Sequence, residues 1–461
     1  MNRNIFKLLR NHDWRGLIEH IGSISPKKIN DHKLSLLILS LNKLGNLKEA
    51  SQIATPYIEK DMKAYPRSIR LTARSLCLLG QYDKAYELLH GAFNDNPEQY
   101  WYYLSMGDVY YYFEGNKDKA LSIYKEGEGI GDENLRSDIL SIYRYLLKRI
   151  SHALFELERY SEAVAYFRKF KQLEPSNFYE SDFVLLGKCL EHMNDIKGAV
   201  EIWLEGTRRR KGYKCLKELK RVDPDIAKNV VIKEKHTPKP GAVSIPVKTK
   251  IITEEDETAD VIAESIKGIA QSGDLVTFAS SVAAVSEGRI YPAEGIKPCR
   301  LARMLSRFVT SSSKSSFATT SPLANPLSFQ VAIEIAGVAR IVTAAIIGAI
   351  GKLFGIKGWF YHIAGKEVAM IDDMPASMAP YDYYVIPGPY DSDHLSTMIK
   401  EKTGFETAII DANDLGIAWV VGASDGIDRK KIEGYMLDNP AGNEDNQTPI
   451  IIIREEGKAD V

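Results

Sequence analysis

Four polar clusters in the second half of the sequence carry the residues best suited to chemistry. Each cluster adjoins a short apolar run; they span residues 286–289, 372–373, 411–414 and 439–449. Carboxylates that converge at strand ends make oxygen-rich sites suited to Mg²⁺ or Mn²⁺, and such ions typically bridge the phosphates of a nucleotide. Simple solvated turns are the alternative interpretation of each cluster taken alone.

Some established catalytic motifs are missing from the sequence. It has no GxxxxGK[ST] phosphate-binding loop, no HExxH zinc motif and no GxSxG nucleophile turn. His362 lies in an apolar run, 359–363, that we expect to be a strand, which favours a satisfied sheet residue over a catalytic base. By contrast, Gly288 stands between Glu287 and Arg289 after an apolar run, where a glycine permits close backbone approach to a ligand.

The elements that position these clusters alternate between short strands and helices. Apolar, β-branched runs occur at 245–252, 275–278, 384–386, 407–410, 418–421 and 450–453, and a further apolar strand is expected at 368–371, before Asp372. Helical patterns lie between several of them, at 259–270 and 392–402. This order predicts a mixed α+β domain from about residue 244.

The first 220 residues have a different pattern, which repeats. Five segments share a small or polar turn, a bulky residue and then an alanine, at Ala50, Ala85, Ala120, Ala163 and Ala199. The alanines are 35, 35, 43 and 36 residues apart, and the longer interval predicts an insertion near 128–145. A weaker sixth copy ends at Leu17, with Trp14 as its bulky residue.

This pattern resembles the tetratricopeptide repeat, whose period is about 34 residues. The resemblance implies an all-α solenoid, in which stacked helix pairs form a concave surface that usually holds a protein or peptide partner. A purely structural helical spacer is the alternative.

The end of the repeats is basic, and a linker follows. Residues 208–221 carry eight Lys and Arg against Glu218 alone, which indicates either a contact with an anionic surface or a solvated last helix; we favour the solvated helix and expect no nucleic acid. Residues 222–243 are rich in Pro and Lys. We therefore predict a solenoid over 1–221, a linker over 222–243 and an α+β domain over 244–461.

A strongly apolar stretch covers residues 329–356. Glu334, Arg340 and Lys352 interrupt it, so it is too short for a membrane span of about 20 residues. It predicts one or two buried or partner-covered helices, with a re-entrant or membrane-surface helix as the alternative. Just before it, nine of the twelve residues 310–321 are Ser or Thr, which is typical of a mobile loop, either a flap over a site or a plain connection.

Length and composition set the remaining limits. The 461 residues predict two or three domains, and 60 Lys and Arg against 61 Asp and Glu exclude a globally basic nucleic-acid binder. The four cysteines are far apart, which argues against a zinc module or a disulfide framework and favours a reducing, cytoplasmic location.

Taken in order, the polar clusters resemble the coenzyme F-420 γ-glutamyl ligase family over about residues 244–456. The matching stretches are 245–249 followed by Glu255 and Asp256, the Ser-Glu-Gly-Arg turn at 286–289, 358–365, 371–372, 410–414 and 447–450. In that family a divalent metal and a nucleoside triphosphate, GTP, activate a carboxylate as an acyl phosphate. The amine of L-glutamate then attacks it and forms an amide.

The resemblance implies roles for individual residues. Asp372 and Asp411 would hold Mg²⁺ or Mn²⁺, and Glu287, Gly288 and Arg289 would line the cleft for the nucleotide or substrate. Further binding residues would be Asn413, Glu444, Asp445, Gln447 and Thr448. The acceptor would be a small-molecule or protein carboxylate, and the family's frequent dimers leave a homodimer open.

The sequence departs from the family at several of these positions. Val285 stands where the family has lysine, Ala412 stands where it has threonine, and the asparagine that follows the first Asp motif is absent. Two hypotheses follow. The first is a ligase-like enzyme to which the repeats bring a partner. The second is a scaffold in which the degenerate ligase domain binds a ligand without chemistry.

Overall fold

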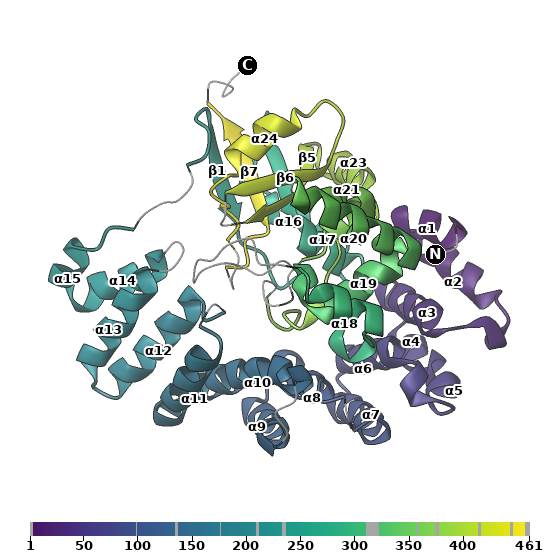
Figure 1. The fold of residues 1–461 in the computed structure, drawn as a ribbon, viewed down its shortest axis with the longest axis horizontal. Coiled ribbons are helices and arrows are strands. Elements are labelled where there is room, and N and C mark those ends of the chain that lie inside the picture. Colours follow the sequence, from purple (N-terminus) through teal and green to yellow (C-terminus); the bar gives the residue numbers. More distant parts are fainter. Residues whose placement is uncertain are drawn as a thin grey trace. The chain divides into compact units, whose positions relative to one another are not determined.

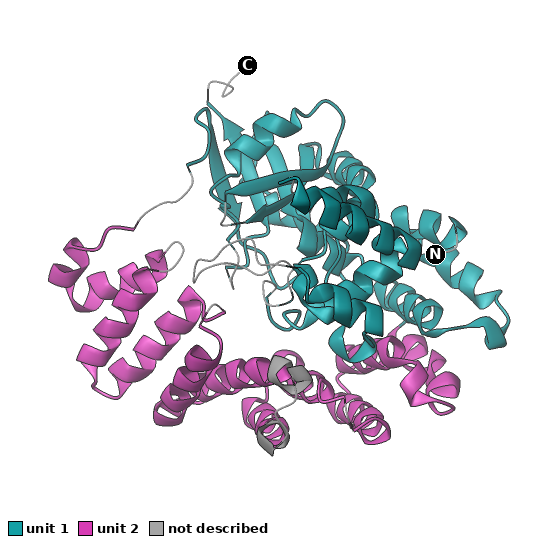
Figure 2. Cartoon of the chain, in the orientation of Figure 1, with its two compact units in different colours: residues 1–46, 235–461 teal, residues 47–234 magenta. Residues whose placement is uncertain are grey.

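The computed structural model describes residues 3–97, 99–133, 137–175, 177–208, 212–232, 237–309, 322–355, 358–372, 374, 378–413, 416–442 and 446–456. By its internal contacts the chain forms two compact units (Figure 2). Residues 1–46 and 235–461 make up the first, and residues 47–234 make up the second. Each unit is described by itself.

The second unit consists of helices (Figure 1). Its α-helices are α4 (Leu47–Ile53), α5 (Thr55–Ile58), α6 (Pro66–Leu78), α7 (Tyr82–Asp95), α8 (Tyr102–Asp108), α9 (Lys117–Glu133), α10 (Ser137–Glu156), α11 (Tyr160–Leu173), α12 (Glu180–His192), α13 (Ile196–Thr207), α14 (Tyr213–Val222) and α15 (Pro224–Lys228). A π-helical turn, η3 (Val109–Glu114), continues α8. Sequential helices pack as pairs, α6 with α7, α8 with α9, α10 with α11 and α12 with α13, and each pair also packs on the next.

The repeat predicted from the sequence is confirmed by the turns of these helix pairs. The five repeat alanines have no exposed surface, which fits their predicted place in the packed face. The residue five positions before each alanine has a positive φ: Gly45, Gly80, Gly115, Glu158 and Asn194. A left-handed residue there ends one helix and redirects the chain into the next. This part of the chain therefore folds as tetratricopeptide-type helical repeats.

The longer interval between the third and fourth copies of the repeat corresponds to longer helices. Helix α9 has 17 residues and α10 has 20, whereas α6 and α12 have 13 each. The predicted insertion at 128–145 thus lies in the end of α9 and the start of α10. In the basic stretch that follows, Arg221 pairs with Glu191 and Glu218, and residues 209–211 lie outside the described part of the chain.

The first unit contains a five-stranded mixed sheet with the order β1-β7-β2-β5-β6. Its strands are β1 (Ala242–Val247), β2 (Leu275–Ala279), β5 (Glu406–Asn413), β6 (Ile417–Ala423) and β7 (Ile450–Glu455), and β3 (Tyr291–Pro292) pairs with β4 (Tyr384–Val385) in a separate ribbon. Strands β2 and β5 are parallel, whereas β1–β7, β2–β7 and β5–β6 are antiparallel. The predicted α+β class of the second half is confirmed.

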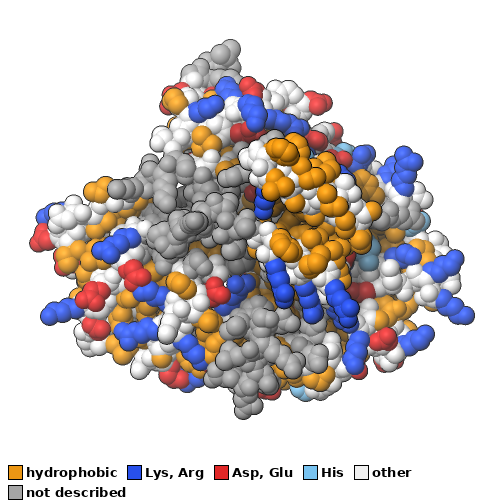
Figure 3. All heavy atoms as spheres, viewed as in Figure 1, with side chains coloured by type: hydrophobic (Ala, Val, Ile, Leu, Met, Phe, Trp, Pro, Cys, Tyr) orange, Lys and Arg blue, Asp and Glu red, His pale blue; other side chains and the backbone are white. Residues whose placement is uncertain are grey.

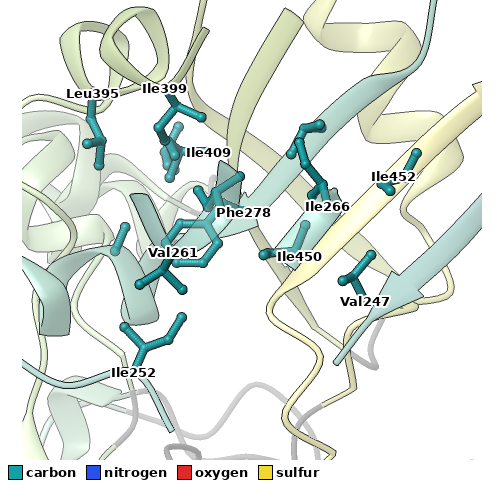
Figure 4. Close-up of a cluster of buried hydrophobic side chains, with 14 of the residues drawn as sticks. Val247, Ile252, Val261, Ile266, Phe278, Leu395, Ile399, Ile409, Ile450 and Ile452 are labelled. Carbon is teal, nitrogen blue, oxygen red and sulfur yellow. The ribbon is translucent and has the colours of Figure 1, made fainter. Parts of the chain in front are cut away.

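Both faces of this sheet are buried. Phe278, Ile409, Ile450 and Ile452 point to a core that also contains residues of α16 (Thr258–Ile266) and α23 (Ser392–Thr403), as Figure 4 shows. The alternate residues, such as Ile451 and Ile453, pack on the other face against α24 (Arg429–Tyr435). Alternation along each strand explains why these runs are apolar throughout.

A group of helices lies between β2 and β4 in the sequence of this unit. It comprises α17 (Ser280–Ser286), α18 (Arg300–Ser306), α19 (Pro326–Ala336), α20 (Val338–Leu353), α21 (Trp359–Ala364) and α22 (Lys366–Ala369). The predicted strand at 359–363 is wrong, because His362 lies on α21. The predicted strand before Asp372 is also wrong, because Val368 lies on α22. Short apolar runs suit buried helices as well as strands, so the residue types alone could not separate the two.

The apolar stretch at 329–356 forms two helices, α19 and α20. Among the described residues no single helix is long and apolar enough to cross a membrane, and these two pass such a test only as a pair bent by 116°. The Ser/Thr-rich segment predicted as a loop, 310–321, lies outside the described residues.

Three N-terminal helices belong to the first unit rather than to the second: α1 (Arg3–Arg10), α2 (Trp14–Gly22) and α3 (Asp31–Lys43). The contacts therefore group residues 1–46 with the α+β domain, whereas the sequence placed them with the repeats. In the region predicted as linker, α15 occupies residues 224–228 and β1 begins at Ala242. The boundaries at 221 and 244 stay a prediction.

Candidate functional site

One edge of the sheet gathers the predicted residues of the third and fourth clusters. Strands β2 and β5 are parallel; β2 ends at Ala279, opposite Ile410, and β5 continues three residues further to Asn413. Strand β7 runs the other way and begins at this edge, with Ile450 opposite Phe278, and the Ala279 amide donates a 3.0 Å hydrogen bond to the Pro449 carbonyl. The end of β5 and the segment before β7 therefore lie two strand spacings apart, roughly 10 Å.

Four predicted residues lie at this edge in described positions. Asn413 ends β5, and its side-chain oxygen accepts a 3.3 Å hydrogen bond from the Ile417 amide across the turn. Gln447 and Thr448 precede β7. The Gln447 carbonyl accepts a 2.8 Å bond from the Thr249 amide, which follows β1, and the Thr448 hydroxyl donates a 2.8 Å bond to the Ala441 carbonyl. The predicted residues Glu444 and Asp445 lie outside the described part of the chain.

Asp411, the fourth of these residues, has a carboxyl group that is partly removed from water. It lies on β5 opposite Trp419 of β6, and its side chain is half-buried. Burial raises the pKa of its carboxyl group above the ordinary value. A desolvated carboxylate is stabilised by a bound cation, since the cation replaces the lost interaction with water.

The element that precedes Asp372 differs from the predicted one. It follows α22 rather than a strand, and its backbone amide donates a 2.9 Å hydrogen bond to the carbonyl of Ile386, just beyond β4. Met370, two residues before it, belongs to the core cluster of the sheet. Within the described residues no group of three or more His, Cys, Asp or Glu side chains is placed to hold a metal ion. The pairing of Asp372 with Asp411 on one metal stays a prediction.

The Ser-Glu-Gly-Arg turn of the first cluster is buried and fully engaged by the chain itself. The Glu287 carboxylate accepts a 2.7 Å hydrogen bond from the Tyr390 amide. The Arg289 guanidinium donates 2.8 Å bonds to the carbonyls of Gly388 and Pro389 and lies over the Tyr390 ring, 4.8 Å from its centroid. It also pairs with Glu367 at 3.2 Å. Glu287 and Arg289 thus fix the loop at 388–390, and their contact with a nucleotide stays a prediction.

Gly288 lies against an N-terminal helix. Its φ is +65°, and together with its neighbours it closes α17, since the amides of Gly288 and Arg289 donate 2.8 Å bonds to the carbonyls of Val285 and Ala284. A Cβ at this position would lie 2.3 Å from a methyl carbon of Leu39 on α3. Only a glycine fits, both for its backbone angle and for the close approach of α3.

Three residues of the N-terminal helices form a polar network with this turn. His12 donates a 3.0 Å hydrogen bond to Glu257 and a 3.4 Å hydrogen bond to Glu287, so its ring lies between two carboxylates. Trp14 donates a 2.6 Å hydrogen bond to Glu257 from its indole nitrogen. The fully buried Lys43 ammonium pairs with Glu257 at 3.2 Å and donates bonds of 2.6 and 2.7 Å to the carbonyls of Asp256 and Ser286.

Mutual charge compensation controls the protonation of this network. Burial alone would lower the pKa of His12, but the hydrogen bonds and charges of Glu257 and Glu287 outweigh it and raise that pKa to about 9. Burial would likewise raise the pKa of Glu257, but His12 and Lys43 lower it to about 2. For Lys43 burial prevails and lowers the pKa. At neutral pH the imidazolium is therefore charged and holds two carboxylates together.

The sequence contained one signal for this network. His12 has a φ of +52° and stands five residues before the fully buried Leu17, which is the position taken by a glycine, asparagine or glutamate in the other copies of the repeat. The weak sixth copy is therefore a repeat turn whose residue also contacts the α+β domain. Its partner Glu257 is 245 residues away, and no local pattern links the two.

The comparisons with known proteins concern each half of the chain separately. Residues 246–440 match the family model F420-0:Gamma-glutamyl ligase. The resemblance seen in the sequence is thereby confirmed, and the second half of the chain contains an F420-0:Gamma-glutamyl ligase-like domain. No curated protein matches the chain.

Several solved structures of helical repeat proteins are similar to the chain. One is the C-terminal part of a TPR repeat-containing protein from Cytophaga hutchinsonii, with 16% identity, 48% of this chain and 96% of that chain covered, and a TM-score of 0.33. Another is YrrB, a TPR protein with an unusual peptide-binding site (14%, 46% and 98%, TM-score 0.29). A third is MamA from Desulfovibrio magneticus RS-1 (13%, 43% and 94%, TM-score 0.28).

Proposed function

We propose that the protein is a nucleotide- and divalent-metal-dependent ligase-like enzyme that forms a glutamyl amide on a carboxylate acceptor. The observation that carries the proposal is that Asp411, Asn413, Gln447 and Thr448 lie at one edge of the sheet. Asp411 and Asn413 belong to the stretch 246–440 that matches the γ-glutamyl ligase family model, and Gln447 and Thr448 follow it in the sequence. The repeats would recruit a partner, either the acceptor itself or a protein that delivers it.

The residues at this edge fit a hard divalent cation. Their side chains offer carboxylate, amide and hydroxyl oxygens, which are the donors that Mg²⁺ and Mn²⁺ prefer. Asp411 and Asp372 would hold the ion, and the raised pKa of Asp411 is the sign of a buried carboxylate that a cation would stabilise. When bound, such an ion neutralises phosphate charge and orients the phosphates of the nucleotide.

The proposed reaction has two steps. First, a carboxylate oxygen of the acceptor attacks the γ-phosphorus of GTP or another nucleoside triphosphate, and the nucleoside diphosphate leaves. Second, the amine of L-glutamate attacks the acyl carbon, loses a proton and expels inorganic phosphate. In this scheme Asn413, Gln447 and Thr448 orient the bound groups, and the other predicted binding residues, Glu444 and Asp445, precede Gln447 in the sequence and lie outside the described residues.

A turnover assay on the full chain tests the proposal. The protein is incubated with Mn²⁺, labelled GTP or ATP, L-glutamate and candidate acceptors, and the release of phosphate is measured. Asp411→Asn should abolish the activity while leaving the circular dichroism spectrum unchanged. Asp425→Asn, which alters an exposed turn after β6, is the matched control and should retain activity. A complete lack of nucleotide turnover and of metal binding by the wild-type chain would end the proposal.

A non-catalytic scaffold is the second candidate, and one observation favours it. Glu287 and Arg289 are buried and bonded to the loop at 388–390, so their polar groups already have partners in the chain. Val285 and Ala412 also replace polar residues of the family. The scaffold predicts that the full chain binds GTP or Mn²⁺ in calorimetry but releases no phosphate with any acceptor.

We also propose a reducing, cytoplasmic location for the protein. All four cysteines are free, and Cys77, Cys189 and Cys215 are buried in the helical repeats. Thiols that persist unpaired are typical of such a compartment.

A further inference from the structure

Helix α20 carries a stripe of exposed aliphatic side chains. Val338, Val342, Ile346, Ile350 and Leu353 follow one another at spacings of three or four residues, so they share one face of the helix. Their side chains are between 36% and 85% exposed. Along the helix the stripe is roughly 22 Å long at about 1.5 Å per residue.

The opposite face of α20 is packed and holds the helix in place. Ile341, Ala344 and Gly351 are buried, and α20 packs on α19 and α21. At Gly348 the backbone of α21 comes so close that a Cβ would lie 3.0 Å from the Cβ of Phe360. The stripe is therefore a fixed outer face of the domain rather than a core face left without its neighbour.

Aromatic and apolar side chains extend this surface. Phe354, just after α20, and Trp359, the first residue of α21, are exposed, as are Met304 on α18 and Phe308 just after it. Figure 3 shows the apolar side chains gathered over α20 and α21. We call the exposed residues of α18, α20 and the start of α21 the apolar surface.

A row of basic side chains borders the apolar surface. Lys297, Arg300, Arg303 and Arg307 are exposed on or next to α18, and within the described residues none of them forms an ion pair. Helix α18 packs on α19, which packs on α20. In Figure 3 a row of blue side chains lies directly below the apolar patch, over α18.

The charge of this region is one-sided. Residues 297–354 contain seven Lys and Arg and one acid, Glu334, although the whole chain has almost equal numbers of both. Glu334 lies on α19 and accepts a hydrogen bond from Gln330. The partner of this surface must therefore be apolar at its centre and negatively charged beside it.

We propose that the apolar surface docks the protein on a phospholipid bilayer that contains anionic lipids. A helix with an exposed aliphatic face, aromatic residues at its end and arginines beside it lies in the interface of a membrane, where the apolar face enters the acyl boundary and the basic groups meet the headgroups. The stripe belongs to a helix of 16 residues, which is shorter than a span, so the protein lies on the membrane and does not cross it.

A second copy of the chain fits this surface less well. A two-fold contact places the same patch of both chains together. The arginines of α18 would then approach those of the other copy, with one acid per chain in this region to offset them. Anionic headgroups remove that repulsion.

Vesicle sedimentation with the full-length protein tests the proposal. Vesicles of phosphatidylcholine alone are compared with vesicles of phosphatidylcholine and phosphatidylglycerol. We expect binding to the anionic vesicles that is at least about tenfold stronger than to the neutral ones and that weakens as salt is added.

Three variants separate the contributions. Ile346→Asp, in the middle of the stripe, should weaken binding by about tenfold or more. Replacement of Arg300 and Arg303 by Gln should weaken binding to anionic vesicles by about tenfold and leave the weak binding to neutral vesicles unchanged. Val243→Asp, at an equally exposed apolar residue on β1, is the control and should bind as the wild type does. Circular dichroism establishes that each variant is folded.

Two results would overturn the proposal. One is a lack of sedimentation with anionic vesicles, or binding that Ile346→Asp leaves intact. The other combines two observations: the wild type does not bind vesicles, and light scattering shows a dimer that Ile346→Asp converts to a monomer. That result would assign the surface to a second copy of the chain.

Discussion

The protonated His12 should stabilise the attachment of the N-terminal helices in a strongly pH-dependent way. Its pKa is about 9 in the folded chain and 6.5 in an unfolded one. The folded chain therefore binds the proton more tightly, so the stabilisation is complete below pH 6.5 and is lost as the pH rises through about 9. Glu257, with a pKa of about 2, stays charged over this whole range.

The size of the effect follows from these two pKa values. A pKa of about 9 in place of 6.5 corresponds to about 3 kcal/mol when it is fully expressed. By linkage most of this stabilisation remains at pH 6 and pH 7, and less than about 1 kcal/mol of it remains at pH 9. His12→Gln removes the titrating group. The difference in stability between wild type and variant therefore reports the contribution of His12 and not that of Lys43, which also faces Glu257.

Hydrogen exchange of the amides of α1 and α2 measures this difference. Short labelling pulses at pH 6, 7 and 9, corrected for the intrinsic exchange rate at each pH, give the free energy of opening of these helices. We expect the His12→Gln variant to lose most protection at pH 6 and almost none at pH 9. His362→Gln, at an exposed histidine of α21, is the control and should change protection in α1 and α2 at no pH. An effect of His12→Gln that is equal at pH 6 and pH 9 would refute the reasoning.

Three further substitutions test the same turn and the strand-end site. Gly288→Ala should lower the midpoint of thermal unfolding of the first unit, because its Cβ would lie 2.3 Å from a leucine of α3; it should cost at least about 1 kcal/mol more than Gly404→Ala, which has a positive φ but open space around it. Trp14→Phe keeps an aromatic ring but loses the five-membered ring of the buried indole and its hydrogen bond to Glu257, and calorimetry should show a loss of at least about 1–2 kcal/mol. Asp411→Asn should leave the thermal midpoint unchanged or raise it, because it relieves the burial of a charge; a lower midpoint would mean that the carboxylate is structural.

Much of the fold could be predicted from local patterns. The repeat alanines and the left-handed turn residues recur at regular intervals because every helix pair packs and turns in the same way. The strands β2, β5, β6 and β7 were predicted because apolar, β-branched runs of four residues or more suit a sheet buried on both faces. The runs around His362 and Val368 were misassigned to strands because a short apolar run has no periodicity that distinguishes a helix from a strand, and these two runs are as long as those that do form strands.

The candidate site could be predicted only in part. The polar residues at the end of β5 and before β7 follow apolar strands directly, so their position at a sheet edge follows from the sequence. The network of His12, Lys43 and Glu257 could not be foreseen, because Glu257 is more than 200 residues from both His12 and Lys43 and each residue has an ordinary local role in a turn or a helix end. For the same reason, the sequence does not predict that the first helices of the chain cover the Ser-Glu-Gly-Arg turn.

The central claim is that Asp372 and Asp411 hold one divalent cation beside a nucleotide. A crystal structure of the full chain with Mn²⁺ and GTP, in which an anomalous difference map locates the manganese, tests this claim. We expect an anomalous peak about 2.0–2.2 Å from an oxygen of each carboxylate, with the nucleotide phosphates next to it. A manganese ion bound elsewhere, or no peak at either aspartate while GTP is bound, would show that the two aspartates do not share a metal ion.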